Sequence, residues 1–324
     1  MFLKRILFGM AWAWVAASAI AADKGVKITQ QEDRLRVEID GELFTEYRFK
    51  GAPHVYFYPL MGPGGAHMTR HYPMQKDSEG EEHDHGHHRS LWYSHGAVNG
   101  VDFWAETPKA GKIVHDKFLD VKSEKDSAMI RSASKWIAPD GTVTCTDERV
   151  FRVYSRPKNE RLFDFEITLL AGDKEVVLGD TKEGTMAIRL AETMRLTHNK
   201  FNAGKPTGQI VQSTGVRDKD TWGKQAEWCD YYGPVGDKVL GVAIFDHPNN
   251  PRHPTSWHVR DYGLFAANPF GLSDFEKKPK GTGDLKIAAG KSVTFKYRFY
   301  IHEGDEQQAK VAERYAEYAG KKAQ

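Results

Sequence analysis

Histidine is concentrated in one short stretch of this 324-residue chain, between His83 and His95. Five of the 14 histidines fall within these 13 residues. Imidazole either ligates metal ions or transfers protons near neutral pH. We expect His85, His87 and His88 to act as catalytic acids or bases. The polar and aromatic residues that follow are expected to bind a substrate: Arg89, His95, Asn99, Asp102 and Trp104.

The alternative for this stretch is a metal site. His83, His85 and His87 fall on one side of an extended segment and are the set that would hold a divalent ion. Their spacing matches no standard site, because a cupin has a glutamate soon after His-x-His, a facial triad has a carboxylate there, and the chain has no HExxH helix. The sequence therefore favours a metal-free His and Arg site and predicts no cofactor, with a divalent metal as the alternative.

A second polar segment runs from Asp246 to Asn268, and its prolines stiffen it. Asn, Asp, His and Arg side chains recognise sugar hydroxyls, and Trp and Tyr offer flat apolar faces to a sugar ring. His258 is expected to be a fourth catalytic group. The expected substrate contacts are Asp246, Asn250, Arg252, His253, Trp257, Arg260, Tyr262 and Asn268. The alternative is a structural network of Asx-turns with Trp257 in the core.

Two signals are weaker. Residues 69–74 lie between glycines and would add a wall to the site. Glu183 or Glu192 would serve as a general base opposite a histidine. A surface or salt-bridged role is the commoner one for such a carboxylate.

A rigid framework must position these side chains, and the sequence predicts that most of this framework consists of β-strands. Leu35, Val37 and Ile39 alternate with charged residues and end at Asp40-Gly41, a two-residue hairpin signal that recurs at Asp140-Gly141. Long alternating strands with turns between them predict an all-β fold, a large antiparallel β-sandwich. Strands are predicted at 34–39, 43–49, 55–60, 113–121, 129–137, 142–154, 163–169, 187–190, 239–245, 257–260 and 292–301.

One helix is predicted near the C-terminus, on the outside of the sandwich. Asp305 would cap it, Gln308 holds the capping-box position, and Val311, Tyr315 and Tyr318 form its apolar stripe. The segments 62–104 and 247–271 lack strand periodicity and are predicted to be functional loops. No composition shift marks a linker, so residues 22–324 are predicted to form one domain.

Residues 1–21 have the features of a signal peptide. Lys4 and Arg5 precede an apolar run, and Ala19-Ile20-Ala21 fits a signal-peptidase site. The run is too short to span a bilayer. We therefore expect cleavage near Ala21 and a periplasmic or secreted protein without a membrane span.

The composition of the mature chain limits its partners. Once residues 1–21 are removed, Lys plus Arg equal Asp plus Glu in number, which excludes a dedicated nucleic-acid binder. Cys145 and Cys229 either pair in an oxidising compartment or stay as free buried thiols. The expected partner is a carbohydrate or another small polar ligand, and the oligomeric state stays open.

Two long stretches, 83–104 and 246–271, resemble the family known as "methane oxygenase PmoA". The matches are HDH at 83–85, HHR at 87–89, LW at 91–92, HG at 95–96, VNGVDFW at 98–104 and nearly all of 246–271. Gly86 and Ser90 depart from the usual proline and glycine. The resemblance implies a secreted, β-rich bacterial protein, often found beside sugar-degrading functions, and assigns no catalytic residues.

These observations together predict a periplasmic sandwich of the supersandwich type, similar to galactose mutarotase-like folds. It would hydrolyse, eliminate or epimerise a glycoside or modified sugar by histidine acid/base chemistry, with Arg89 and Arg260 holding an anionic or enolate-like oxygen. The alternatives are a non-catalytic sugar-binding protein and a His-ligated metalloenzyme.

Three further expectations follow from this interpretation. Segments 83–102 and 247–268 should line one pocket that exposes an aromatic face. His88→Ala and His258→Ala should each abolish turnover while the fold stays intact. The rate should depend on pH between about 5 and 8.

Overall fold

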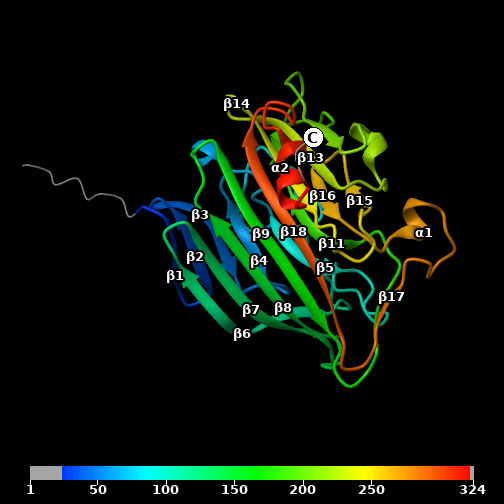
Figure 1. Cartoon of the computed structure of the whole chain (residues 1–324). Coiled ribbons are helices and arrows are strands. Elements are labelled where there is room, and N and C mark those ends of the chain that lie inside the picture. Colours follow the sequence, from blue (N-terminus) through cyan, green and yellow to red (C-terminus); the bar gives the residue numbers. More distant parts are fainter. Residues whose placement is uncertain (1–23, 322–324) are drawn as a thin grey trace, which may run out of the picture.

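Two eight-stranded antiparallel sheets form the body of the protein, as a computed structural model of the chain shows for residues 24–321 (Figure 1). The first sheet has, in spatial order, β1 (Val26–Gln30), β2 (Arg34–Ile39), β3 (Glu42–Arg48), β4 (Tyr56–Leu60), β5 (Leu91–His95), β11 (Gly184–Arg189), β16 (Leu264–Ala267) and β15 (Trp257–Val259). The second has β12 (Gln209–Gln212), β13 (Trp228–Val235), β14 (Lys238–Asp246), β18 (Ser292–Glu303), β9 (Glu160–Leu170), β8 (Val143–Tyr154), β7 (Ser127–Ile137) and β6 (Lys112–Ser123).

The remaining elements are short. A two-stranded sheet pairs β10 (Val176–Leu178) with β17 (Leu285–Ile287). The helices are α1 (Leu272–Phe275) and α2 (Val311–Tyr318), and the 3₁₀ turns are η1 (Pro63–Gly65), η2 (Glu192–Met194) and η3 (Asp218–Thr221). The predicted all-β sandwich with a C-terminal helix is confirmed. The predicted signal peptide lies outside the described residues.

Local sequence explains the strand pairs. Asp40 and Gly41 both have positive φ angles, 52° and 80°, as a two-residue turn of the hairpin type requires, and Ile39 pairs with Glu42 across it. Asp140-Gly141 lies inside a longer loop, because the last pair before the turn joins Ile137 to Val143.

The apolar faces of the two sheets meet in one core. On β9, the alternate residues Phe163, Phe165, Ile167 and Leu169 are all buried there. Phe163 stacks on Phe299 of β18 with ring centroids 4.7 Å apart. Burial of such rings supplies most of the driving force for folding.

Two central strands, β5 and β16, fall in segments that were predicted to be loops, and that prediction is wrong for them. Both strands are buried along their whole length, so no polar residue marks an exposed face. A strand covered on both faces has no alternation to read. The loops themselves are shorter than predicted and lie at the ends of these strands.

The C-terminal helix packs outside the second sheet, as predicted (Figure 1). Asp305 accepts hydrogen bonds from the backbone N–H groups of Gln307 and Gln308, and Gln308 Oε1 accepts one from the N–H of Asp305. This capping box closes the turn that leads into α2, and the α-helix itself begins at Val311. Val311 and Tyr315 are buried against Phe245 and Tyr300 of the sheet.

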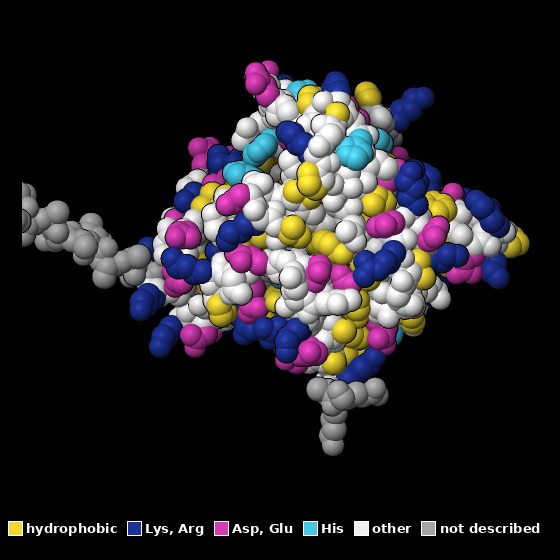
Figure 2. All heavy atoms as spheres, turned by 90° about the horizontal axis from the view of Figure 1, so that it is seen from above, with side chains coloured by type: hydrophobic (Ala, Val, Ile, Leu, Met, Phe, Trp, Pro, Cys, Tyr) yellow, Lys and Arg dark blue, Asp and Glu magenta, His cyan; other side chains and the backbone are white. Residues whose placement is uncertain are grey.

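The surface carries both signs of charge, in line with the balanced numbers of acidic and basic residues, and the two cysteines are unpaired. Positive and negative side chains are interleaved on the face shown in Figure 2. Cys145 and Cys229 are both buried and free, which decides between the two alternatives for them. Within residues 24–321, no helix is long and apolar enough to cross a bilayer.

Candidate functional site

The outer face of the first sheet carries a row of side chains across the five adjacent strands β4, β5, β11, β16 and β15. Cross-strand pairing aligns Tyr56, Trp92, Ala187, Ala266 and His258 in this row. Residues paired in this way share a face of the sheet. All five are buried, so the loops cover this face. The row forms the floor on which the predicted loop residues lie.

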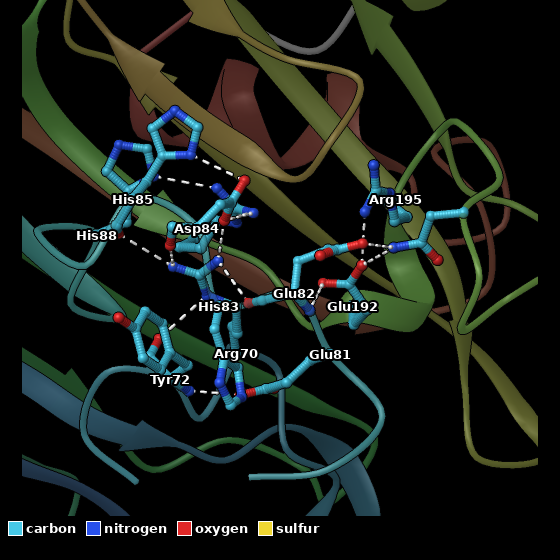
Figure 3. Close-up of polar contacts among 12 residues, drawn as sticks. Arg70, Tyr72, Glu81, Glu82, His83, Asp84, His85, His88, Glu192 and Arg195 are labelled. Carbon is cyan, nitrogen blue, oxygen red and sulfur yellow. Dashed lines mark hydrogen bonds and ion pairs between the residues drawn. The ribbon is translucent and has the colours of Figure 1, made fainter. Parts of the chain in front are cut away.

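Arg70 holds the histidine stretch in place over this floor. Its guanidinium is completely buried and donates hydrogen bonds to the backbone carbonyls of Tyr72, Glu82, Asp84 and His85, over 2.8–3.1 Å. It also donates to the Asp84 carboxylate. Figure 3 shows how these contacts gather the segment around one side chain. Arg70 therefore fixes the backbone from which the catalytic candidates project.

Arg189, at the end of β11, is the second buried arginine of the site. It donates to Oδ1 of Asp84 over 2.9 Å and to Nδ1 of His88 over 3.1 Å. Burial and the charge of Arg70 lower the pKa of Arg189 to about 10, so its guanidinium stays charged at neutral pH. Burial works to raise the pKa of Asp84, but the hydrogen bond from His85 and the two arginines lower it well below its usual range.

His88 is a neutral imidazole of fixed tautomer. An arginine only donates hydrogen bonds, so Nδ1 of His88 must accept the one from Arg189, and Nε2 carries the proton. Burial, together with the charge of Arg189, holds the pKa of His88 well below its ordinary value. His88 therefore presents an N–H donor at neutral pH.

His85 has the opposite arrangement. Its Nδ1 lies 2.8 Å from Oδ2 of the ionised Asp84, so Nδ1 donates and the lone pair sits on Nε2. The His85 side chain is 41% exposed, and its ring stacks on His88 with centroids 4.8 Å apart at 11°. A base and a neutral donor therefore lie side by side (Figure 3).

His87 is the third histidine of the cluster, and it is half-buried. Its ring meets that of His88 edge-on, with centroids 4.4 Å apart, and lies 5.8 Å from that of His85. Burial, followed by the proximity of His85, lowers the pKa of His87 to about 4, while the carboxylate of Glu183 opposes this shift. His87 is therefore neutral at physiological pH.

The two predicted segments meet at Tyr262. Its ring stacks on His85, with centroids 5.2 Å apart at 9°. The guanidiniums of Arg189 and Arg260 lie over the same ring, 4.7 Å and 5.6 Å from its centre. Tyr262 is half-buried, whereas Trp92, Trp104 and Trp257 are at most 2% exposed. Among the aromatic faces that were expected, Tyr262 is the one that reaches the surface.

His258 approaches the same site from β15. It is buried beside Trp222 and Phe275, with centroid distances of 6.4 Å and 6.2 Å. Burial lowers the pKa of His258 to about 4, and the carboxylate of Glu183 opposes the shift. Because Glu183 also acts on His87 and Tyr262, this carboxylate stands within electrostatic reach of both segments.

Several predicted substrate contacts make hydrogen bonds within the scaffold. Asp246 accepts from Asn250, from His253 and from the N–H of Thr255, which ties the proline-rich loop together. Trp257 is fully buried in the core, and its indole donates to the carbonyl of Ala226. Asp246, Asn250, His253 and Trp257 thus make hydrogen bonds within the protein, and their role as ligand contacts stays a prediction.

Arg252 and Asn268 also belong to the scaffold. Arg252 donates to the carbonyls of Pro269, Gly283 and Asp284, and Asn268 donates to those of Thr181 and Lys182. These bonds fasten the loop around α1 to the sheet. Asn268 uses both of its amide hydrogens in these bonds, and Arg252 uses three of its five N–H donors.

The predicted site residues that follow the histidine cluster also make contacts within the scaffold. Arg89 makes two hydrogen bonds to Glu106 at 2.5 Å and 2.7 Å. His95 is buried, and its Nε2 donates to the carbonyl of Gly179. Asp102 accepts from two backbone N–H groups of the next turn, and Asn99 pairs with the backbone of β10. Trp104 is buried over His87 and His88 and supports the site without exposing a face.

The predicted metal alternative does not assemble. Nε2 of His83 donates to the carbonyl of Ser78 over 2.8 Å, and its ring stacks on Tyr72, 4.5 Å away. His83 thus makes its contacts apart from the ring contact between His85 and His87. Within the described part of the chain, no group of three or more His, Cys, Asp or Glu side chains is placed to hold a metal ion.

Sequence reasoning missed three side chains of the site. Arg189 was noted only as part of a strand, Arg70 only as part of a wall, and Trp222 lies outside both polar segments. A buried arginine in a strand is a signal for Arg189, since such a charge needs a partner. Nothing in the local sequence around Trp222 sets it apart.

Solved structures with a similar arrangement are distant. An α-galactosidase from Lactobacillus brevis matches at 10% identity and a TM-score of 0.44, over 89% of this chain and 41% of that one. A galactose 1-epimerase from Lactobacillus acidophilus NCFM matches at 9% and 0.37, over 86% and 98%. A putative aldose 1-epimerase from Klebsiella pneumoniae subsp. pneumoniae matches at 10% and 0.42, over 91% and 92%. Likeness at this level does not indicate a shared activity.

Comparison of sequences places the chain in a family. No curated protein matches it. A family profile matches residues 34–316, and that family is not the "methane oxygenase PmoA" family suggested by the two polar stretches, so this assignment is corrected. The chain belongs to a family of unknown function, DUF6807.

Proposed function

We propose that this protein is a carbohydrate-active enzyme that cleaves or isomerises a glycoside or modified sugar by imidazole acid/base chemistry. The observation that carries the proposal is the opposite hydrogen-bonding state of two stacked imidazoles, His85 and His88. Asp84 and Arg189 impose these states, and both partners are themselves locked in place. Opposed roles set by different surroundings are the usual sign of an acid/base pair.

The pair suits proton transfer at a carbon or oxygen of a sugar. Nε2 of His85 can take a proton, while the Nε2–H of His88 donates a hydrogen bond to a neighbouring oxygen that gains negative charge. Glu183 is a second group that can accept or return a proton from the side of His258. A site that only binds sugar gains little from imidazoles held in this way.

The surroundings of the pair suit a sugar ring. Tyr262 offers a flat, half-buried face beside His85. Arg260 and Glu183 surround that face with a donor and an acceptor. Aromatic rings with polar groups at their edge match the apolar C–H surface and the hydroxyls of a pyranose.

Export from the cytoplasm is part of this proposal. Residues 1–21 have the sequence of a signal peptide, and the mature protein would act in the periplasm or outside the cell. N-terminal sequencing of the protein recovered from a bacterial periplasm should start near Ala22. A start at Met1 would contradict export.

The function is tested by turnover of defined sugars. Freshly dissolved α-glucose and α-galactose are followed by polarimetry, nitrophenyl glycosides by absorbance, and lactose, cellobiose and digalacturonate by chromatography. We expect at least one to be converted, and His85→Ala to lower the rate about 10²–10⁴-fold. The control is His198→Ala, which removes an exposed imidazole bonded only to the carbonyl of Lys205.

Two results would replace the proposal by its alternatives. Binding of these sugars without any conversion indicates a sugar-binding protein. Activity that is lost on chelation and restored by one divalent metal indicates a metalloenzyme.

A further inference from the structure

A cavity adjoins the histidine site at Arg260. It has a volume of about 240 Å³ and is lined by Ile210, Asp218, Lys219, Trp222, Val259, Arg260 and Asp261. Pockets for drug-sized ligands have about 300–1,000 Å³. This cavity is therefore of the size for one ring of a larger molecule.

Trp222 supplies its aromatic surface. The indole is half-buried, and Phe275 of α1 meets it edge-on with centroids 5.2 Å apart. On its other side lies His258, 6.4 Å away. Nε1 of Trp222 is buried and has no hydrogen-bond partner among the described residues, which is uncommon for an indole N–H. The ring is thus held by packing rather than by a hydrogen bond, and its partly exposed surface lines the cavity.

Two carboxylates and an ammonium group line the same cavity. The carbonyl of Asp261 accepts from the backbone N–H groups of Leu196 and Thr197 at 3.0 Å and 3.3 Å, so its backbone is fixed. Its carboxylate faces Lys219, with Nζ and Oδ2 3.6 Å apart. Asp218 holds the N–H of Ile210 with one oxygen. Acidic and basic groups around an aromatic face are the lining that hydroxyls of a sugar need.

Arg260 joins this cavity to the histidine site. Its guanidinium lies over Trp222 at 5.9 Å and over Tyr262 at 5.6 Å, and Tyr262 stacks on His85. In the part of the chain that the structure describes, the Arg260 side chain makes these ring contacts and no hydrogen bond or ion pair. The neighbouring Arg70 and Arg189, by contrast, are bonded to protein groups. Arg260 therefore has its donors free on the wall that the two sites share.

We propose that this cavity is a second sugar subsite and that the substrate is an oligosaccharide of at least two rings. This inference rests on the proposed function. One ring lies against Tyr262 beside the histidines, the next lies against Trp222, and Arg260 donates hydrogen bonds to oxygens at the junction. The shared chemistry is a pyranose ring with free hydroxyls, with or without a carboxylate, since a guanidinium binds both.

The test compares each disaccharide with its own monosaccharide, by calorimetry or saturation-transfer NMR on the full-length mature protein. The probes are galactose and lactose, glucose and cellobiose, and galacturonate and digalacturonate. We expect at least one disaccharide to bind about tenfold more tightly than its monosaccharide or more, which corresponds to about 1.4 kcal/mol. The uronate pair separates a carboxylate-bearing substrate from a neutral one.

Trp222→Ala should bring the ratio of the two affinities close to one, and Trp222→Phe should keep most of it. Asp261→Asn replaces one carboxylate oxygen at the partly exposed edge of the cavity and should also lower this ratio. This variant serves as the test if Trp222→Ala fails to fold. His198→Ala should leave the ratio as in the wild type. A ratio that stays unchanged in Trp222→Ala, or no disaccharide bound more tightly than its monosaccharide, overturns the subsite.

These outcomes separate the subsite from the proposed catalysis. If a disaccharide binds more tightly than its monosaccharide, this difference depends on Trp222 and no sugar is converted, the result supports the subsite and contradicts the proposed enzyme. Conversion that depends on His85, without a role for Trp222 in the affinity ratio, keeps the enzyme and rejects the subsite.

Discussion

The guanidinium of Arg189 donates a hydrogen bond to Nδ1 of His88 across 101 residues of sequence. This bond decides which nitrogen of His88 carries its proton. The backbone adds a second link, because the N–H of Arg189 donates to the carbonyl of Ser90 over 2.7 Å. The chemistry available to His88 therefore depends on the pairing of β11 with the chain just before β5.

Arg189→Met should change the tautomer of His88. Without the guanidinium, nothing requires Nδ1 to accept, and long-range ¹⁵N NMR of the ring should show a mixture of tautomers. We expect a loss of about 1–3 kcal/mol in the free energy of unfolding, since the buried His88 and the partly exposed Asp84 each lose a donor. Asp84 keeps Arg70, so the larger loss of about 3–5 kcal/mol for a broken buried pair is not expected. An unchanged ¹⁵N spectrum would show that Arg189 does not set the tautomer.

Arg70→Met should loosen the histidine stretch. The wild-type side chain bonds four backbone carbonyls, and these bonds are lost in the variant. Hydrogen exchange of residues 82–88 should accelerate, while exchange in β9 should change little. Equal acceleration in both places would mean that the whole fold, and not this segment, depends on Arg70.

His83→Ala and His85→Ala form a matched pair in one loop. His83 stacks on Tyr72 outside the site, whereas His85 faces Tyr262 within it. We expect the first change to leave turnover within about twofold and the second to lower it about 10²–10⁴-fold. Similar losses in both variants would point to a metal held by the two imidazoles, and metal analysis of the purified protein would check this.

Stability should fall as the pH drops from about 6.5 towards 4. Burial lowers the pKa of His54 to about 3 and those of His95 and His258 to about 4, from an ordinary value of 6.5. Between these values the unfolded chain binds more protons than the folded one, so the stabilisation is complete above 6.5 and is lost on acidification. Urea unfolding at pH 7 and 5 should differ by on the order of 1–2 kcal/mol for each such histidine. His95→Gln should reduce that difference, and an equal difference in the variant would contradict the assignment.

The same pKa values alter two expectations drawn from the sequence. The pKa of His258 is about 4, so this side chain stays neutral between pH 5 and 8, and burial also lowers the pKa of His88 well below its ordinary value. Neither imidazole is therefore expected to give the rate a pH dependence centred on the ordinary histidine pKa. His88 is also buried and paired with Arg189, so His88→Ala should lower stability as well as turnover. Thermal unfolding of the variant checks this.

The sequence was sufficient to predict the fold class and the long strands of the molecule. Alternation predicted long strands such as β7, β8 and β9, and Asp40-Gly41 predicted its hairpin, because these signals depend on neighbours in the chain. The concentration of histidine located the segment that contains His85 and His88. The strands β5 and β16 were missed, since burial on both faces removes the alternation.

Only the tertiary structure separated site from scaffold. Asp246 and Arg260 look alike in sequence, as polar residues of one loop, yet the first is bonded to its own loop and the second has its donors free. Arg189, Glu183 and Trp222 join the site from strands and turns far away in the chain. The role of a polar side chain depends on whether a partner satisfies it, and that partner is supplied by strand pairing between distant residues, which no local pattern records.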